Sequence, residues 1–239
     1  IIEASSFQLS YSKFIKPDYA VILNISNDHI DWHGSLKNYV NSKFKIFSNQ
    51  NCNNFAFLND KKLIEKFKKE KYESKINYVS LKNYISIKHR IKNNYLNLEA
   101  NIENMGYVYA LSKILKINQK SFINSFQSFK GLNHRYEIFL KKKNKIFIND
   151  SKATSFEATR YALINNKNIY WIVGGLPKSG DKLKLGSVKN NIIKAYVIGK
   201  HMKFFKKQLK GKVDLKLCKT LENSILDISR ETKNILNKK

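Results

Sequence analysis

The sequence has few features that would tie it to a membrane, an oxidising compartment or a metal finger. No stretch approaches the roughly 20 apolar residues that a membrane-spanning helix needs, and no secretory signal opens the chain. The two cysteines, Cys52 and Cys218, are far apart, so they offer no disulfide framework and no paired zinc ligands. We therefore expect no membrane span and a reducing, cytoplasmic setting.

Arginine is scarce although the chain is strongly basic. The formal net charge is +27, yet only four cations are arginines: Arg90, Arg135, Arg160 and Arg230. The lysines are spread along the whole length beside many Asn and Ile residues, which is typical of an AT-rich genome. A basic chain can bind nucleic acid, but this spread favours a solvated lysine-rich surface, and we expect no nucleic-acid partner.

The sequence also lacks the Gly-x-x-x-x-Gly-Lys-Ser/Thr loop that cradles phosphates in many ATP-binding proteins. It contains no internal repeat and no low-complexity linker. A glycine-rich segment at 174–181 follows a predicted strand and contains Lys178, but its spacing differs from that loop. This segment is compatible with anion binding and equally with an ordinary turn.

The residues that are present predict an α/β protein of two domains. A length of 239 residues and a hydrophobic content of 42% allow two cores of ordinary size. In the first half we predict strands at 19–24, 55–58 and 76–79, a hairpin at 84–98, and helices at 35–47, 101–115 and 121–129. In the second half we predict strands at 145–149, 169–173, 194–199 and 213–218, and helices at 155–165, 201–209 and 221–236.

Strands that alternate with helices in the second half indicate a parallel sheet with right-handed crossovers. We place the domain boundary so that the domains comprise residues 1–130 and 131–239, with a linker at 131–135. The chain begins without methionine, inside an apparent strand-to-loop segment, and stops inside a helical pattern. We therefore expect a piece of a longer protein, with both domains incomplete at their outer ends.

The segment 145–154 is the most informative part of the chain. An apolar run at 145–148 predicts a buried strand. The polar residues Asn149, Asp150, Ser151, Lys152 and Thr154 follow at once. Ligands of α/β proteins bind at the carboxyl ends of strands, so the segment could form a site for a polar, anionic small molecule. A helix N-cap beside a solvated lysine explains the same residues about as well.

A second polar cluster follows the first predicted strand. Asp28, His29, Asp31 and His33 lie within six residues, and Glu3 lies near the start of the chain. Carboxylates and imidazoles together can bind a divalent cation. The spacing matches no known zinc signature, and an ordinary polar loop remains the alternative.

Lys43 occupies an unusual position in the predicted helix 35–47. The apolar positions of this helix include Val40 and Phe44, and Lys43 borders the stripe that they form. A lysine at the edge of a buried stripe extends its amine to solvent, pairs with an anion, or is chemically modified.

Six segments together resemble one family, the Mur ligases. In chain order they are 3–9 (Glu-Ala-Ser-Ser-Phe-Gln-Leu), 24–31 (Asn-Ile-Ser-Asn-Asp-His-Ile-Asp), 42–43 (Ser-Lys), 131–135 (Gly-Leu-Asn-His-Arg), 149–154 (Asn-Asp-Ser-Lys-Ala-Thr) and 174–179 (Gly-Gly-Leu-Pro-Lys-Ser). The resemblance spans nearly the whole chain. The first and fifth segments are similar to those of the members that add D-glutamate to UDP-N-acetylmuramoyl-L-alanine.

The resemblance implies a part of the central ATPase domain followed by a Rossmann-like C-terminal domain. It implies ATP-dependent amide formation through an acyl phosphate, with magnesium, in peptidoglycan precursor synthesis. The family's phosphate loop and UDP-binding domain would precede this chain, so we expect the chain to be inactive alone, and we expect a monomer. A folylpolyglutamate-type ligase and a basic nucleic-acid-binding protein are the alternatives.

The resemblance also assigns roles to individual residues. The implied magnesium-site and catalytic residues are Glu3, His29 and Lys43, with Lys43 converted to a carbamate. The implied contacts with the nucleotide-sugar are Ser5 and Gln8. The implied nucleotide contacts are Asn104, Arg135 and Asp150. The implied contacts with the D-glutamate carboxylates are Lys152, Thr154 and Lys178, which suit anions. Ala100 stands where the family usually has a histidine near the adenine.

Overall fold

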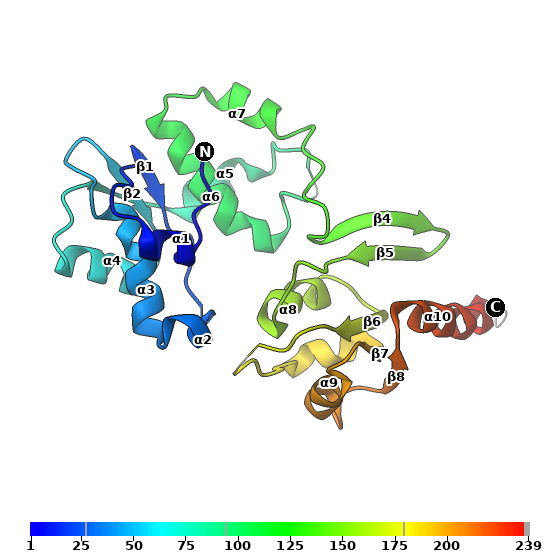
Figure 1. The fold of residues 1–239 in the computed structure, drawn as a ribbon. Helices are drawn as coiled ribbons and strands as arrows, with labels where there is room; N and C mark the ends of the chain where they lie inside the picture. The colour runs from blue at the N-terminus through cyan, green and yellow to red at the C-terminus, as the bar shows by residue number, and fades with distance from the viewer. Residues whose placement is uncertain (27, 94, 179, 237–239) are drawn as a thin grey trace. The chain divides into compact units, whose positions relative to one another are not determined.

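The computed structural model describes residues 1–26, 28–93, 95–178 and 180–236, and for Ala100 and residues 234–236 it describes the backbone alone. The chain forms two compact units, unit 1 (Ile1–Gly131) and unit 2 (Leu132–Lys239). The predicted boundary lies one residue before this division. Both units combine helices with parallel strands (Figure 1), so the predicted α/β class is confirmed.

Unit 1 is built on a three-stranded parallel sheet in the order β1 (Tyr19–Val21), β2 (Phe55–Leu58), β3 (Lys75–Tyr78). Its helices are α1 (Ser6–Tyr11), α2 (Ile30–His33), α3 (Leu36–Phe44), α4 (Lys61–Lys69), α5 (Leu81–Lys88), α6 (Glu99–Ile114) and α7 (Gln119–Ser125), and a short 3-10 turn, η1 (Lys45–Phe47), follows α3.

Successive side chains of a strand point to opposite faces of the sheet, and β2 shows the consequence. Leu58 packs in one cluster with Phe47 of η1 and Phe67 of α4. Phe57 packs in another with Tyr107 of α6. Helices therefore cover both faces of this sheet.

A third cluster in unit 1 joins α5, α6 and α7, and it overturns one prediction. The described residues of the segment 84–98 form no hairpin: α5 covers the start of the segment, and turns follow. Tyr84 and Ile87 are both buried in this cluster. Three residues apart, they share a helix face, so the apolar residues that suggested a strand follow the helical period.

Unit 2 begins with an antiparallel hairpin of β4 (Glu137–Lys142) and β5 (Lys145–Asn149). The sequence pattern of β5 predicts a buried strand of a parallel sheet, and this prediction is wrong. Ile146 is 57% exposed and Phe147 is 36% exposed. A tight turn at residues 143–144, with Lys143 at φ 51°, pairs β5 with its immediate neighbour instead.

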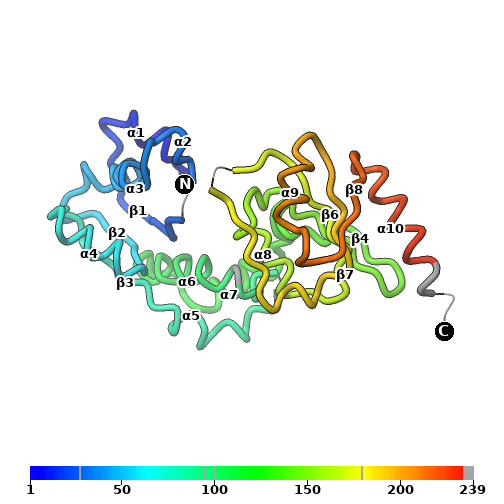
Figure 2. The backbone as a smooth tube through the Cα atoms, turned by 90° about the horizontal axis from the view of Figure 1, so that it is seen from below, coloured from blue at the N-terminus to red at the C-terminus, as the bar shows by residue number. Residues whose placement is uncertain are grey.

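The remaining strands of unit 2 form a parallel sheet in the order β6 (Ile169–Gly174), β7 (Ile192–Ile198), β8 (Leu215–Lys219). The helices are α8 (Phe156–Ile164), α9 (Met202–Leu209) and α10 (Leu221–Leu236), with a 3-10 turn η2 (Gly186–Asn191) before β7. Figure 2 traces these elements from below. The apolar core joins Trp171 and Val197 of the sheet to Leu163 of α8 and Leu209 of α9.

The α10 helix meets the sheet through charged side chains. Lys194 of β7 donates to Glu231 of α10 at 3.0 Å and lies 3.7 Å from Asp214. These partners raise the pKa of Lys194. Among the described residues, no helix has the length and apolar character needed to span a bilayer.

Candidate active site

In unit 1 the loop that follows β1 is anchored by α6. The hydroxyl of Tyr107 donates to the carbonyls of Ile22 at 3.1 Å and Leu23 at 3.0 Å. One turn earlier on α6, Glu103 accepts a hydrogen bond from Asn24 at 3.2 Å. Asn104, the predicted adenine contact, follows Glu103 directly and is partly buried, so it lies on the helix that holds the end of β1.

His29 begins the four-residue helix α2 in the left-handed conformation, with φ at 53°. Non-glycine residues adopt this conformation infrequently. The carboxylate of Asp28 accepts a hydrogen bond from the His29 backbone at 2.9 Å and lies 3.6 Å from His29 Nε2. The imidazole is 42% exposed, so it can bind a ligand from solvent.

Lys43 lies near the end of α3, half-buried, beside this loop. Burial lowers the pKa of its amine, while the carboxylates of Asp28 and Glu3 act in the opposite direction. Its Nζ lies 5.3 Å from the centre of the Tyr39 ring, within the range of a cation–π contact. The structure therefore brings Lys43 near the carboxylates of Glu3 and Asp28. Asp28 directly precedes His29 in the sequence.

Ser5 and Gln8, predicted to contact the nucleotide-sugar, form a capping box at the start of α1. The Ser5 backbone donates to Gln8 Oε1 at 2.8 Å, and the Gln8 backbone donates to Ser5 Oγ at 3.2 Å. A capping box satisfies two backbone donors at a helix start. Both side chains are exposed, so the box leaves them at the surface of unit 1.

The unit 1 residues fit a magnesium ion only in part. Within the described ranges, no three His, Cys, Asp or Glu side chains gather closely enough to hold a metal. Magnesium prefers oxygen ligands, and an ammonium at Lys43 would repel it. A carbamate at Lys43 would supply the missing anionic oxygens beside Asp28 and Glu3, so the fit depends on this modification.

In unit 2 the predicted nucleotide residues Arg135 and Asp150 lie close together. Asp150 accepts a hydrogen bond from the Tyr136 backbone at 2.8 Å. Burial raises the pKa of Asp150, while the Tyr136 bond and the Arg135 guanidinium act in the opposite direction. A second bond, from the Lys152 backbone to the His134 carbonyl at 3.0 Å, ties the two segments together.

The predicted D-glutamate residues lie around the start of α8. Thr154 and Lys152 are exposed just before the helix. Asp181, at the end of the loop that carries Lys178, accepts a hydrogen bond from the Phe156 backbone at 3.0 Å. This bond holds the loop of Lys178 beside the segment of Thr154, although the two lie more than twenty residues apart in the sequence.

Three positions that the resemblance used are not described in full. Asn27 and Ser179 lie outside the described residues, and so does the side chain of Ala100. The adenine pocket near Ala100 and the end of the glycine-rich segment therefore stay as predictions.

Sequence reasoning missed two residues that shape the candidate site. Tyr39 lies four residues before Lys43 on α3, a spacing that places both side chains on one helix face and could have been noticed. Asp181 caps the start of α8 from 25 residues away, and no local pattern indicates such a contact.

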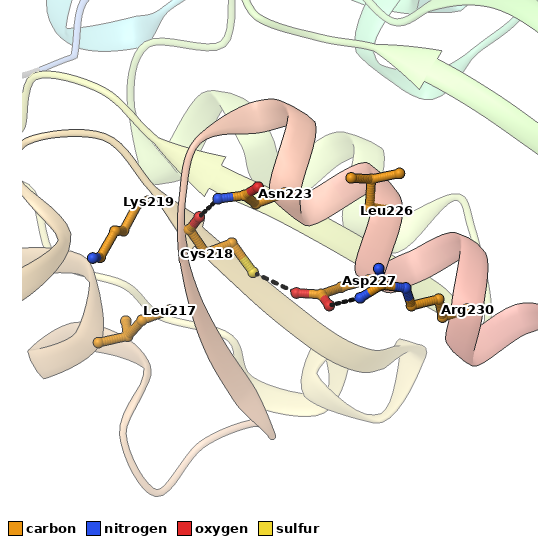
Figure 3. A pocket seen from close by; sticks show the side chains of 7 residues that line it. All are labelled: Leu217, Cys218, Lys219, Asn223, Leu226, Asp227 and Arg230. Carbon is orange, nitrogen blue, oxygen red and sulfur yellow. Dashed lines mark hydrogen bonds and ion pairs between the residues drawn. The ribbon is translucent and has the colours of Figure 1, made fainter.

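Two surface cavities lie apart from the predicted site residues. One, of about 360 Å³, is lined by Leu217, Cys218, Lys219, Asn223, Leu226, Asp227 and Arg230. Figure 3 shows Cys218 and Asp227 pointing toward one another, and the thiol donates to the carboxylate at 3.4 Å. The other, of about 390 Å³, lies between β3, α5 and α6 and is lined by residues that include Tyr78, Ser80 and Lys113.

Comparison with known sequences identifies relatives over most of the chain. A UDP-N-acetylmuramoylalanine–D-glutamate ligase from Wolbachia sp. subsp. Brugia malayi is 35% identical over 225 residues, 88% of this chain and 45% of the relative. The enzyme of that name from Rickettsia felis is 33% identical over 262 residues, 99% of this chain and 58% of the relative. The chain thus spans about half the length of these relatives.

Solved structures share the fold at low identity. MurF from Acinetobacter baumannii matches with a TM-score of 0.62 and 14% identity over 91% of this chain and 54% of that protein. MurF from Thermotoga maritima, in complex with ADP, matches with a TM-score of 0.59 and 16% identity over 84% of this chain and 53% of that protein. The sequence profile described as "Mur ligase middle domain" matches residues 1–122. The chain therefore belongs to the Mur ligase family.

Proposed function

We propose that this chain is part of an ATP-dependent ligase that joins D-glutamate to UDP-N-acetylmuramoyl-L-alanine. The relatives bearing that name support the choice of substrates, and the ADP complex of a neighbouring fold supports the use of ATP. The single observation that carries the proposal is the environment of Lys43, a half-buried amine with a lowered pKa beside two carboxylates.

This environment favours modification of Lys43. Only a neutral amine attacks carbon dioxide, and burial increases its fraction by disfavouring the ammonium form. The nitrogen forms a bond to the carbon of carbon dioxide and releases a proton, which leaves an anionic carbamate. Together with Glu3 and His29, that carbamate would hold magnesium. When bound, magnesium neutralises the negative charge of phosphate groups.

The reaction proceeds in two steps. A carboxylate oxygen of the acyl substrate attacks the γ-phosphorus of ATP, ADP leaves, and an acyl phosphate forms. The amine of D-glutamate then attacks the acyl carbon, the bond to the phosphate oxygen breaks, and phosphate and a proton are released. Asn104, Arg135 and Asp150 would contact the nucleotide, and Ser5 and Gln8 the nucleotide-sugar.

In unit 2, Lys152, Thr154 and Lys178 would bind the two carboxylates of D-glutamate. Ammonium groups form strong charge-assisted hydrogen bonds with carboxylates. The Asp181 contact with the start of α8 supports this assignment, because it holds two of the binding segments together.

The proposal is tested by turnover of the gene product that contains this chain. We expect D-glutamate to be used in strong preference to L-glutamate, whereas L-glutamate added to a folate would identify the folylpolyglutamate-type alternative. Lys43→Ala should lower kcat about 100-fold or more, and a small carboxylate in the buffer should restore part of the activity. Lys37→Ala, on an exposed site of the same helix, is the control. Unchanged activity of Lys43→Ala would refute the carbamate role.

A further inference from the structure

His33 is a buried imidazole that the proposed reaction does not use. Its side chain is one of the few buried ionisable groups in unit 1, with 6% exposure. Burial lowers its pKa, and the neighbouring His29 and Lys43 act in the same direction. The neutral form of the ring is therefore favoured, and the ring lies at the end of the helix that His29 begins.

Both ring nitrogens of His33 have serine partners from other helices. Nε2 lies 3.0 Å from Ser6 Oγ on α1, and Nδ1 lies 3.4 Å from Ser42 Oγ on α3. The two serines are themselves buried, at 2% and 9% exposure. A neutral imidazole carries one donor and one acceptor, and a hydroxyl can serve as either, so the neutral ring can satisfy both serine contacts at once.

The ring is also held by aromatic neighbours. Its centre lies 5.6 Å from that of Phe7, 4.5 Å from that of Trp32 and 5.2 Å from that of Tyr39. The His33 carbonyl accepts a hydrogen bond from the Asn38 side chain at 2.9 Å. These contacts leave the ring little room to rotate, and both nitrogens are occupied, so His33 is not available as a metal ligand.

The two serines stand next to residues of the candidate site. Ser6 follows Ser5, which caps α1 together with Gln8. Ser42 precedes Lys43 on α3. His33 thus connects three elements: the helix that bears the nucleotide-sugar contacts, the helix of Lys43, and the short helix that starts at His29.

We propose that His33 is a positioning residue, which sets the place of Lys43 relative to His29 through its bonds to Ser6 and Ser42. This inference rests on the proposed function of Lys43 and His29. Partners that orient ligands in this way usually change metal affinity or activity by about 10- to 100-fold when they are replaced. A ring that merely fills space would instead be replaceable by another ring.

The experiment measures the carbamate of Lys43 in the 239-residue chain. The chain is incubated with magnesium and carbon-13-labelled bicarbonate, and the carbamate carbon is observed by NMR, with Lys43→Ala to identify its signal. His33→Phe should lower carbamate occupancy about tenfold or more. His33→Gln, which keeps a donor and an acceptor, should retain most of it. His89→Phe, at an exposed histidine of unit 1, should have no effect.

The outcomes separate the inference from the proposed function. If the wild-type chain shows no carbamate signal, or only a signal that persists in Lys43→Ala, the proposed role of Lys43 fails. The inference about His33 then fails with it. If the wild-type signal is present and His33→Phe leaves it unchanged, the inference alone is overturned.

A second measurement applies even if His33→Phe does not fold. Ser6→Ala and Ser42→Ala each remove one of the two serine contacts and keep the ring, and each should lower the carbamate occupancy of Lys43 about tenfold. A carbamate signal that neither substitution lowers would overturn the inference, because the two serine contacts would then not position Lys43.

Discussion

Replacing Tyr107 with phenylalanine removes a hydroxyl that donates to two backbone carbonyls just after β1. Tyr107 is 2% exposed, and its hydroxyl donates to the carbonyls of Ile22 and Leu23 at 3.1 and 3.0 Å. These carbonyls lie at the start of the loop that leads to His29. The substitution therefore tests how firmly the candidate site is attached to the core of unit 1.

The expected loss follows from the burial of the two acceptors. Ile22 is 6% exposed, so its carbonyl has little access to water, whereas Leu23 is 38% exposed and its carbonyl can be hydrated. A buried acceptor that loses its donor costs about 1–3 kcal/mol. The Asn59 backbone also loses its hydrogen bond to this hydroxyl. We therefore expect the free energy of unfolding of unit 1 to fall by about 1–3 kcal/mol, which is roughly 5-fold or more in the unfolding equilibrium constant.

The assay is urea unfolding followed by tryptophan fluorescence. The chain has two tryptophans, Trp32 in unit 1 and Trp171 in the core of unit 2. Trp171→Phe in every variant leaves Trp32 as the reporter of unit 1. The matched control is Tyr84→Phe, because the Tyr84 hydroxyl is buried without a hydrogen-bond partner among the described residues.

The two substitutions delete the same atom from two buried tyrosines of one unit. Removing an unpaired buried hydroxyl is neutral or stabilising, so Tyr84→Phe should leave unit 1 as stable or more stable. Equal destabilisation by both changes would show that the loss is one of packing, and the reasoning from hydrogen bonds would be refuted.

Three further predictions concern acidity, thiol access and backbone packing. Burial holds the pKa of His33 below its ordinary value of 6.5, so the unfolded chain binds the proton first as the pH falls. The free energy of unfolding of unit 1 should therefore fall as the pH drops below about 6.5, and His33→Gln should weaken this pH dependence. The measurement is urea unfolding at a series of pH values. A wild-type free energy of unfolding that does not change with pH would contradict the prediction. Cys52 is exposed and Cys218 is buried, and the thiol pKa of Cys218 is raised chiefly by burial. A thiol reagent should therefore label Cys52 first. Equal labelling rates of the two cysteines, followed by mass spectrometry, would contradict the burial of Cys218. Gly174→Ala should destabilise unit 2 by about 3 kcal/mol, because its Cβ would lie 2.4 Å from the Ile198 carbonyl oxygen. Gly211 has open space around it but a backbone φ of +75°, so Gly211→Ala should destabilise unit 2 by about 1 kcal/mol. Thermal unfolding in which Gly211→Ala is the more destabilising of the two substitutions would show that the structure relieves the close approach at Gly174.

Several elements could be predicted because their signals are local. The apolar run of β2 is buried along most of its length, and the predicted helix 201–209, which is α9, buries Phe205 and Leu209 four residues apart. The position of Lys43 at the edge of the α3 stripe was visible in the same way. The segment 84–98 failed because Tyr84 and Ile87 satisfy the helical period as well, and packing against α6 and α7 decided between the two.

The sequence by itself determined the α/β class, most of the helices and strands, and the residue types that form the candidate site. Only the tertiary structure decided that β5 pairs with β4 rather than with a parallel sheet, and that His33 meets Ser6 and Ser42 across 27 and 9 residues. The physical reason is that periodicity records which side of an element is buried, but not what covers it. Partners distant in the chain, and the burial that sets the pKa of Lys43, exist only once the helices have packed.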